Sequence, residues 1–317
     1  MSIYNDFIIF IIGIFVIIKS ADLFTGGAQV IASFFKIPRV IVGLTIVSIA
    51  TTMPEFTVSA LSSYMGAGDI AVGNATGSCL ANIGLILATA AIIGKVKFQQ
   101  RTVNQELIFL IGISLFALLL MWDGELAFSD GISLCCVLGT FFGYVIYREL
   151  QARKTNKDNS DVSHLPIKKG CIKFAIGAAG VVLSAKFAII PSGISIAHYF
   201  KIPEIVIGIS MIAIGTSLPE LVTAIIASIK KMDDLAAGNV IGANILNILW
   251  VLGASSVIRP LPIDEKTKII TMPLVAIFAL IIFLFTRKSL VLKRAQGIIF
   301  VLIYIAYLVY IVKFAYV

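Results

Sequence analysis

A glutamate embedded in a long apolar run occurs twice in this chain, and this feature limits the possible fold more than any other. The two stretches read GLTIVSIATTMPEF at 43–56 and GISMIAIGTSLPEL at 208–221, and each ends in hydroxyl side chains, a proline and one glutamate. An acidic side chain at the centre of a membrane-spanning helix costs about 2.5–3.5 kcal/mol on insertion scales, so it marks a functional site by default. Any fold proposed for the chain must therefore explain Glu55 and Glu220.

The composition is that of a membrane protein. Of the 317 residues, 59% are hydrophobic and 13% are charged, whereas soluble domains average about 45–50% apolar and about 25% charged residues. Long unbroken apolar runs exclude a β-barrel, whose strands alternate polar and apolar side chains. Since about 20 residues cross a bilayer as a helix, we expect ten transmembrane helices, near residues 5–32, 39–65, 69–94, 104–122, 127–148, 169–198, 204–230, 235–257, 268–286 and 296–315.

The basic residues indicate the orientation of these helices. The net charge of +8 is spread over many short connectors, which argues against a nucleic-acid partner. With the N-terminus outside, 18 of the 25 Lys and Arg residues fall on cytoplasmic connectors and five outside. The positive-inside rule therefore predicts a multi-pass protein of the cell (inner) membrane with both termini outside. The lipid bilayer is the expected partner, and the sequence indicates no obligatory protein partner.

The chain repeats itself at one constant offset, which places residue 208 on residue 43. Residues 43–88 and 208–253 share 14 identities in 46 ungapped positions, including the proline and glutamate of the motif. We expect a first five-helix repeat at 1–150, a cytoplasmic linker at 151–168 and a second repeat at 169–317. Five is an odd number, so the second repeat enters the membrane from the opposite side. The predicted fold is an all-α polytopic membrane protein with ten transmembrane helices in two inverted five-helix repeats, typical of secondary transporters.

Each motif offers oxygen ligands on a broken helix. Thr51 and Glu55 share one helical face, and a proline removes one backbone N–H and displaces a carbonyl group. Displaced carbonyls at membrane depth are tolerated where they line a cavity. Carboxylate, hydroxyl and carbonyl oxygens are the ligands of hard cations such as Ca²⁺, whereas soft metals favour Cys and His. Neither motif contains Cys or His, and the four cysteines of the chain are predicted to be buried structural thiols.

The helix after each motif adds amides. Asn82 and Asn247 follow their respective glutamates at the same spacing, and Ser78 shares a helical face with Asn82. We expect both asparagines to face the cation site. For Asn74 and Asn239 two interpretations remain open, because such amides either line the site or hydrogen-bond neighbouring helices.

Charge then suggests a mechanism. Two bare carboxylates in a low-dielectric site repel each other, so an empty protein should resist moving the site across the membrane. One Ca²⁺ neutralises the pair, and two or more Na⁺ ions or protons can do the same. Only loaded forms would alternate, which predicts obligatory exchange.

The paired motifs, with GNATGSCLANIG and GNVIGANILNIL after them, resemble the two α-repeats of the Ca²⁺/cation antiporter superfamily, especially prokaryotic sodium/calcium exchangers. The resemblance covers nearly the whole chain. It implies that the first and sixth spans slide against the other eight, and that Ca²⁺ and Na⁺ are transported rather than held as cofactors. It also implies a cation site made of Glu55, Glu220, Thr51 and Thr216, the backbone carbonyls of Ser48 and Ala213, and Ser78, Asn82, Thr52, Ser217 and Asn247 around them.

Several departures from the family pattern bear on the counter-ion. Ala50 stands where Gly is usual, which leaves both hydroxyls of the first motif in place. Ala243 stands where the family often has Ser, so one hydroxyl of a sodium site is missing, and Cys79 replaces a common Asn. Asn247 is Asp in some relatives, including potassium-dependent ones, and a neutral amide argues against K⁺ co-transport.

The sequence thus favours an antiporter that exchanges Ca²⁺ for Na⁺. An antiporter that exchanges Ca²⁺ for H⁺, or for another cation, is the alternative, since two glutamates can carry protons. A cation channel is disfavoured because two acids in one chain do not form a ring around a pore, and a non-transporting structural protein leaves the paired glutamates unexplained. No nucleophile–base pair or cofactor motif is present, so we expect neither enzymatic activity nor a cofactor.

Overall fold

Helices make up most of the chain that the computed structural model describes, which is residues 3–34, 48–155, 167–229 and 233–315. Up to residue 155 they are α1 (Ile3–Phe34), α3 (Ser48–Thr51), α4 (Met53–Met65), α5 (Gly68–Ala81), η2 (Asn82–Leu87), α6 (Ala88–Ile93), η3 (Thr102–Glu106), α7 (Leu107–Leu120) and α8 (Phe128–Thr155), where η marks a π-helical turn. From residue 167 they are α9 (Ile167–Ser184), η4 (Ala185–Ile189), α10 (Ile190–Phe200), α11 (Glu204–Ile207), η5 (Gly208–Ile212), α12 (Ala213–Thr216), α13 (Leu218–Ile229), α14 (Asp233–Leu246), η6 (Asn247–Leu252), α15 (Gly253–Ile258), η7 (Thr267–Thr271), α16 (Met272–Thr286), α17 (Arg294–Tyr310) and η8 (Ile311–Ala315).

Eight helical stretches among the described residues are long and apolar enough to cross a membrane: Ile3–Phe24, Gly68–Ile93, Thr102–Leu120, Phe128–Arg148, Ile167–Phe200, Ala237–Ile258, Thr267–Thr286 and Arg294–Lys313. They coincide with eight of the ten predicted spans. The other two, 39–65 and 204–230, contain the glutamate motifs and are divided into shorter helices. Residues 39–47 and 230 lie outside the described residues, so ten crossings remain a prediction. Most of the predicted linker, 156–166, also lies outside them, and α8 and α9 extend into its two ends.

The repeat is structural as well as sequential. The bounds of α5, η2 and α6 recur in α14, η6 and α15 at the offset of the sequence repeat, and those of α3 recur in α12. Identical helix boundaries require equivalent turns and breaks, so the two halves fold locally in the same way.

Short strands join the connectors in pairs. Strand β1 (Val96–Lys97) pairs antiparallel with β4 (Val291–Leu292), and β2 (Glu125–Leu126) pairs with β3 (Leu261–Pro262). The charge pattern assigns the connectors of β1 and β4 to the cytoplasm and those of β2 and β3 to the outside. Each pairing therefore joins two connectors predicted on the same side.

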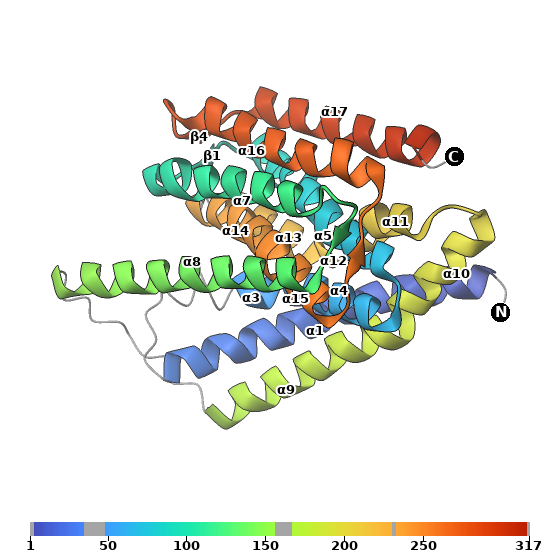
Figure 1. Cartoon of the computed structure of the whole chain (residues 1–317). Helices are drawn as coiled ribbons and strands as arrows, with labels where there is room; N and C mark the ends of the chain where they lie inside the picture. Colours follow the sequence, from blue (N-terminus) through green and yellow to red (C-terminus); the bar gives the residue numbers. More distant parts are fainter. Residues whose placement is uncertain (1–2, 35–47, 156–166, 230–232, 316–317) are drawn as a thin grey trace.

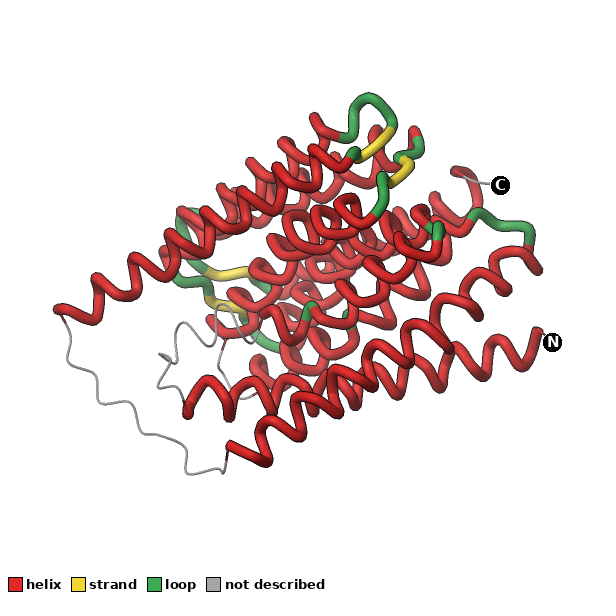
Figure 2. The backbone as a smooth tube through the Cα atoms, turned by 60° about the horizontal axis from the view of Figure 1, so that its bottom comes forward, coloured by secondary structure: helices red, strands yellow, loops and turns green. Residues whose placement is uncertain are grey.

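The course of the chain is visible in two views. Helix α1 begins and α17 ends at one end of the bundle, whereas α8 ends and α9 begins at the other (Figures 1 and 2). The part up to α8 and the part from α9 thus run from end to end in opposite senses. An odd number of crossings in each half has this consequence.

The two longest helical segments pack against each other. Helix α1 lies beside α9 along the bundle (Figure 2), and glycines permit the close approach. A Cβ atom on Gly27 would come within 2.4 Å of the Phe174 nitrogen, and one on Gly177 within 2.3 Å of the Phe24 nitrogen. Ser184 donates a hydrogen bond to the Gly13 carbonyl at 2.7 Å. Small residues at a helix contact are typical of association in lipid, where apolar burial alone supplies little drive.

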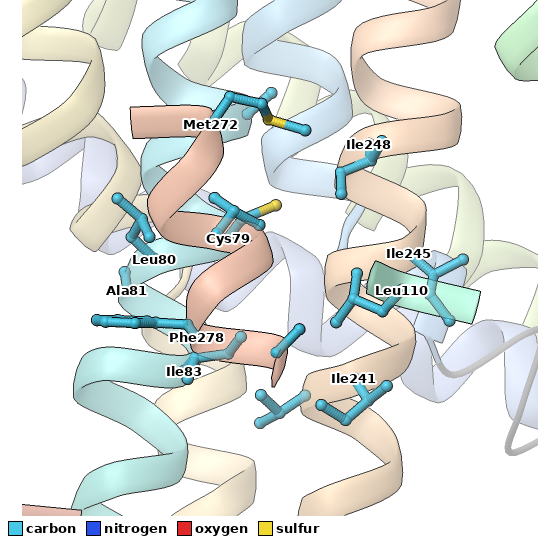
Figure 3. Close-up of a cluster of buried hydrophobic side chains, with 14 of the residues drawn as sticks. Cys79, Leu80, Ala81, Ile83, Leu110, Ile241, Ile245, Ile248, Met272 and Phe278 are labelled. Atoms are coloured by element: carbon cyan, nitrogen blue, oxygen red, sulfur yellow. The ribbon is translucent and has the colours of Figure 1, made fainter. Parts of the chain in front are cut away.

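Buried apolar side chains form two clusters. One cluster joins α1, α9 and α10 to parts of α4, α5 and the segment 207–212. The larger one lies among α5, α7, α14 and α16, where Leu80, Leu110, Ile245 and Phe278 are buried (Figure 3). The pair α1 and α9 is therefore packed largely outside the main core.

The cysteines depart from their predicted burial. Cys79 is buried in the main core, but Cys135 is half-buried, and Cys136 and Cys171 are exposed. The prediction of four buried thiols is wrong for these three because they lie on faces of α8 and α9 that no other described element fully covers. Apolar composition alone does not distinguish a lipid-facing position from a core position.

We predict that Gly77→Ala lowers the stability of the fold. A Cβ at Gly77 would lie 2.6 Å from the Ile209 carbonyl oxygen and 2.7 Å from the Ile209 Cα, and backbone atoms cannot move aside cheaply. Overpacking of this kind costs about 1–3 kcal/mol. The midpoint of thermal unfolding in detergent measures the effect. Gly112→Ala is the matched control, since a Cβ there meets no described atom within 4 Å. Equal midpoints for the two variants would contradict the proposed close contact.

Candidate functional site

The predicted helix breaks are confirmed. Helix α3 ends at Thr51 and α4 begins at Met53, and α12 ends at Thr216 and α13 begins at Leu218. Pro54 lies in the first turn of α4, where its missing N–H removes no helical hydrogen bond. Each glutamate consequently lies in the first turn of a new helix. The N-terminus of a helix carries a partial positive charge, which stabilises a carboxylate.

Both glutamates are fully buried. The Ser217 hydroxyl donates to Oε1 of Glu55 at 2.9 Å, so a residue from the second motif contacts the acid of the first. Thr51 lies beside Glu220 in the reciprocal position. Among the described residues, Oε2 of Glu55 and both carboxylate oxygens of Glu220 have no hydrogen-bond partner. Buried polar atoms normally have a partner, so these three carboxylate oxygens can accept a cation or a proton.

Asn74 connects the two motifs. Its Nδ2 donates to the Glu55 carbonyl at 3.1 Å and to the Ser59 hydroxyl at 2.9 Å. Its Oδ1 accepts from the Thr216 hydroxyl at 3.1 Å. Of the two interpretations that the sequence left open, the cross-linking one applies to Asn74. Its counterpart Asn239 is also buried, but neither of its amide atoms finds a partner among the described residues.

The amides predicted as ligands begin π-helical turns. Asn82 is the first residue of η2 and Asn247 the first of η6, and such turns within α-helices occur frequently at functional sites. Nδ2 of Asn82 donates to Oδ1 of Asn244 at 2.9 Å. In the described part of the chain, Oδ1 of Asn82, the Ser78 hydroxyl and both amide atoms of Asn247 are buried without a partner.

One of the two backbone carbonyls implied by the family resemblance already accepts hydrogen bonds. The Ala213 carbonyl already accepts from the Ser217 N–H at 3.1 Å and from the Thr216 hydroxyl at 3.3 Å. The Thr216 hydroxyl has two further acceptors, Oδ1 of Asn74 and the Ile212 carbonyl, so its bond to the Ala213 carbonyl can be given up to a cation. Ser48 is the first residue of α3.

The structure therefore brings both acids, the hydroxyls and the amides into the interior, and all but Ser78 have a counterpart of the same kind in the other repeat. The buried members are Thr51, Thr52, Glu55, Ser78, Asn82, Thr216, Ser217, Glu220 and Asn247. Within the described ranges, no three His, Cys, Asp or Glu side chains group as a metal centre. Sequence reasoning missed Asn244, because the equivalent position in the first repeat holds Cys79 and the pair carries no shared signal.

Comparisons with known proteins agree with these observations. The chain matches the family model described as sodium/calcium exchanger protein over residues 5–147 and 169–313. It is 36% identical over 260 residues to Inner membrane protein YrbG of Escherichia coli (strain K12), covering 80% of this chain and 80% of that protein. It is 29% identical to Sodium/calcium exchanger MaX1 of Methanosarcina acetivorans, covering 96% of this chain and 97% of that protein.

Solved structures show the same likeness. The structure of the sodium-calcium exchanger NCX_Mj soaked with 2.5 mM Na⁺ and 0.1 mM Ca²⁺ matches with a TM-score of 0.67 and 30% identity, covering 98% of each chain. The structure of that protein soaked without Na⁺ and Ca²⁺ matches with a TM-score of 0.66 and 29% identity. The similarity extends over both glutamate motifs.

We predict that Asn74→Ala destabilises the protein more than Thr76→Val does. The first change removes the three hydrogen bonds of the Asn74 side chain, and a buried polar group left unpaired costs about 1–3 kcal/mol. Of the three partners, the Thr216 hydroxyl keeps the Ile212 and Ala213 carbonyls as acceptors. Thr76 bonds only the Val72 carbonyl of its own helix at 2.8 Å. Thermal unfolding in detergent compares the two variants. A midpoint for Asn74→Ala at or above that of Thr76→Val would show that the cross-link contributes little.

Proposed function

The chain belongs to the sodium/calcium exchanger protein family, and from this premise we propose that it exchanges Ca²⁺ for Na⁺ by alternating access at a midplane site formed by Glu55 and Glu220. The observation that carries the proposal is the pair of fully buried carboxylates, one from each repeat, with three oxygens lacking a partner among the described residues. Such acids within a membrane are costly unless a cation or proton neutralises them.

The surrounding atoms fit a hard cation as cargo. Ca²⁺ binds 6–8 oxygens at about 2.3–2.6 Å. Besides the carboxylates, the cluster offers the hydroxyls of Thr51, Thr216 and Ser78 and the amide oxygens of Asn82 and Asn247, with Thr52 and Ser217 next to the acids. We assign Ca²⁺ to the carboxylates together with these neutral oxygens, and Na⁺ to positions that share the same ligands. The backbone carbonyls of Ser48 and Ala213 complete the proposed set.

Coupling follows from charge neutralisation. Two unit charges 4 Å apart interact by about 4 kcal/mol at an effective dielectric constant near 20, so the empty dicarboxylate opposes movement of its site through the membrane. Ca²⁺ removes this repulsion, and so do two or more Na⁺ ions. The protein then changes access only in loaded forms, which makes it an exchanger rather than a channel.

The proposed movement uses the architecture of two inverted repeats of five spans. The opposite courses of the two halves of the chain support the inversion. The apolar cluster that joins α1, α9 and α10 to α4, α5 and residues 207–212 is distinct from the main core. We propose it as the surface along which the unit of α1, α9 and α10 slides against the remaining helices. A glycine-lined contact between α1 and α9 keeps that unit together while it moves.

We place the protein in the cell (inner) membrane with both termini outside. The strand pairings β1 with β4 and β2 with β3 support the grouping of these connectors on common sides, and the distribution of basic residues gives the orientation. A transporter of this kind needs Ca²⁺, Na⁺ and a bilayer. We propose no resident cofactor and no obligatory protein partner.

We predict that Glu55→Gln and Glu220→Gln each lower Ca²⁺ uptake at least 100-fold, since a neutral amide cannot balance the charge of Ca²⁺. The measurement is ⁴⁵Ca²⁺ uptake into proteoliposomes with an imposed Na⁺, K⁺ or H⁺ gradient, and the wild type should respond to Na⁺. Glu106→Gln is the matched control. Glu106 is a buried acid that lies outside the proposed cation site and pairs with Arg101 at 3.4 Å. Uptake driven by a pH gradient alone would instead favour exchange of Ca²⁺ for H⁺.

The missing hydroxyl at position 243 generates a second prediction. Ser78 and Ala243 are equivalent and both buried, so the second repeat offers one oxygen fewer for Na⁺. Ala243→Ser should lower the Na⁺ concentration for half-maximal exchange several-fold, and Ser78→Ala should raise it. Uptake measured against Na⁺ concentration distinguishes the variants. Unchanged Na⁺ dependence in both would remove these positions from the Na⁺ site.

A further inference from the structure

Asn244 of α14 makes three polar contacts with Cys79 and Asn82 of the first repeat. Its Oδ1 accepts from Nδ2 of Asn82 at 2.9 Å, and its Nδ2 donates to the Cys79 carbonyl at 3.1 Å. Its own carbonyl faces the Cys79 sulfur at 3.8 Å. The residue is fully buried, and both polar atoms of its side chain form hydrogen bonds.

Asn244 and Cys79 are counterparts in the repeat, since the same offset that relates the two glutamates relates them. A residue and its counterpart touch each other only near the axis that relates the two halves. The Cys79 side chain projects from α5 toward the neighbouring helix that carries Ile245 and Ile248 (Figure 3). The contact is thus a point where the two repeats meet, one helical turn from Asn82 and Asn247.

The unequal pair makes the two amide ligands unequal. Asn82 has its Nδ2 fixed by Asn244, which leaves Oδ1 as its only atom without a partner in the described chain. Asn247 lies beside the Cys79 thiol, but neither its Nδ2 nor its Oδ1 forms a hydrogen bond with a described residue. A thiol is a weak donor and a weak acceptor, so it does not orient the Asn247 amide as Asn244 orients Asn82.

We infer that Asn244 is a positioning residue, which holds Asn82 with its carbonyl oxygen toward the cation, and that Cys79 leaves Asn247 without an equivalent support. This inference rests on the proposed cation site and deepens it. Binding on the Asn82 side is preorganised, whereas binding on the Asn247 side requires the amide to be ordered when the ion arrives. Partners that orient metal ligands typically contribute about 10- to 100-fold to metal affinity.

The exchange of the two residues supplies the test. We expect Asn244→Cys to weaken equilibrium ⁴⁵Ca²⁺ binding to the purified protein at least tenfold. The double variant Cys79→Asn with Asn244→Cys moves the amide to the other repeat at equal composition. It should return the dissociation constant to within about threefold of the wild type, because Asn247 then gains the support that Asn82 loses.

The relative importance of Asn82 and Asn247 for Ca²⁺ binding should reverse in the double variant. In the wild type, Asn82→Ala should weaken Ca²⁺ binding more than Asn247→Ala does, and in the double variant Asn247→Ala should weaken it more. A purely structural role for Asn244 would change protein yield and unfolding temperature without reversing this order. The comparison of Asn82→Ala with Asn247→Ala needs only the wild-type background, so it also serves where Asn244→Cys does not fold.

Equal costs of Asn82→Ala and Asn247→Ala in the wild type would overturn the inference, and so would wild-type affinity in Asn244→Cys. Binding and transport are measured separately. A protein that binds Ca²⁺ with the expected order but moves none across a membrane contradicts the proposed exchange and not the role of Asn244. A wild type that binds no Ca²⁺ contradicts both.

Discussion

Two carboxylates buried in a membrane-embedded interior are the constraint on which the rest of this structure depends. Glu55 and Glu220 have no access to solvent, and the surrounding protein provides only partial compensation. Each lies in the first turn of a helix that begins after a break, and hydroxyls of the opposite motif lie next to each. Neutral donors and helix dipoles reduce the cost of a buried charge without balancing it. In the function we propose, a cation from solution completes the site, and the need for it couples binding to movement.

Duplication provides the two acids, and divergence between the copies makes their surroundings unequal. Asn74 bonds Ser59, whereas position 224, the counterpart of Ser59, is Ala and Asn239 has no described partner. Ala243 is the counterpart of Ser78 in the second repeat, and Asn244 is the counterpart of Cys79. Each difference removes a polar group from one side only. A site with two unequal sides can bind one divalent ion at its centre and hold monovalent ions with different affinities around it.

The sequence predicted those parts of the structure that depend on residue type and on local geometry. Proline beside a glutamate in an apolar run indicated the helix breaks, and the constant offset of the repeat indicated which side chains are equivalent. Properties that depend on packing between distant segments were not accessible. The bond from Asn82 to Asn244 joins residues 162 positions apart, and the Ala213 carbonyl is engaged by a hydroxyl whose rotamer the sequence does not specify. Cys136 lies in an apolar run like that of Cys79, yet it is exposed, because composition does not distinguish lipid-facing from core positions.

The central claim is that the dicarboxylate site crosses the membrane only when cations neutralise it. Efflux of ⁴⁵Ca²⁺ from loaded proteoliposomes tests it most directly, with the outer solution either free of Na⁺ and Ca²⁺ at constant pH or supplied with one of these ions. The account predicts that Ca²⁺ leaves rapidly when external Na⁺ or Ca²⁺ is present and stays inside when both are absent. Efflux that proceeds equally well without any exchangeable cation would contradict it.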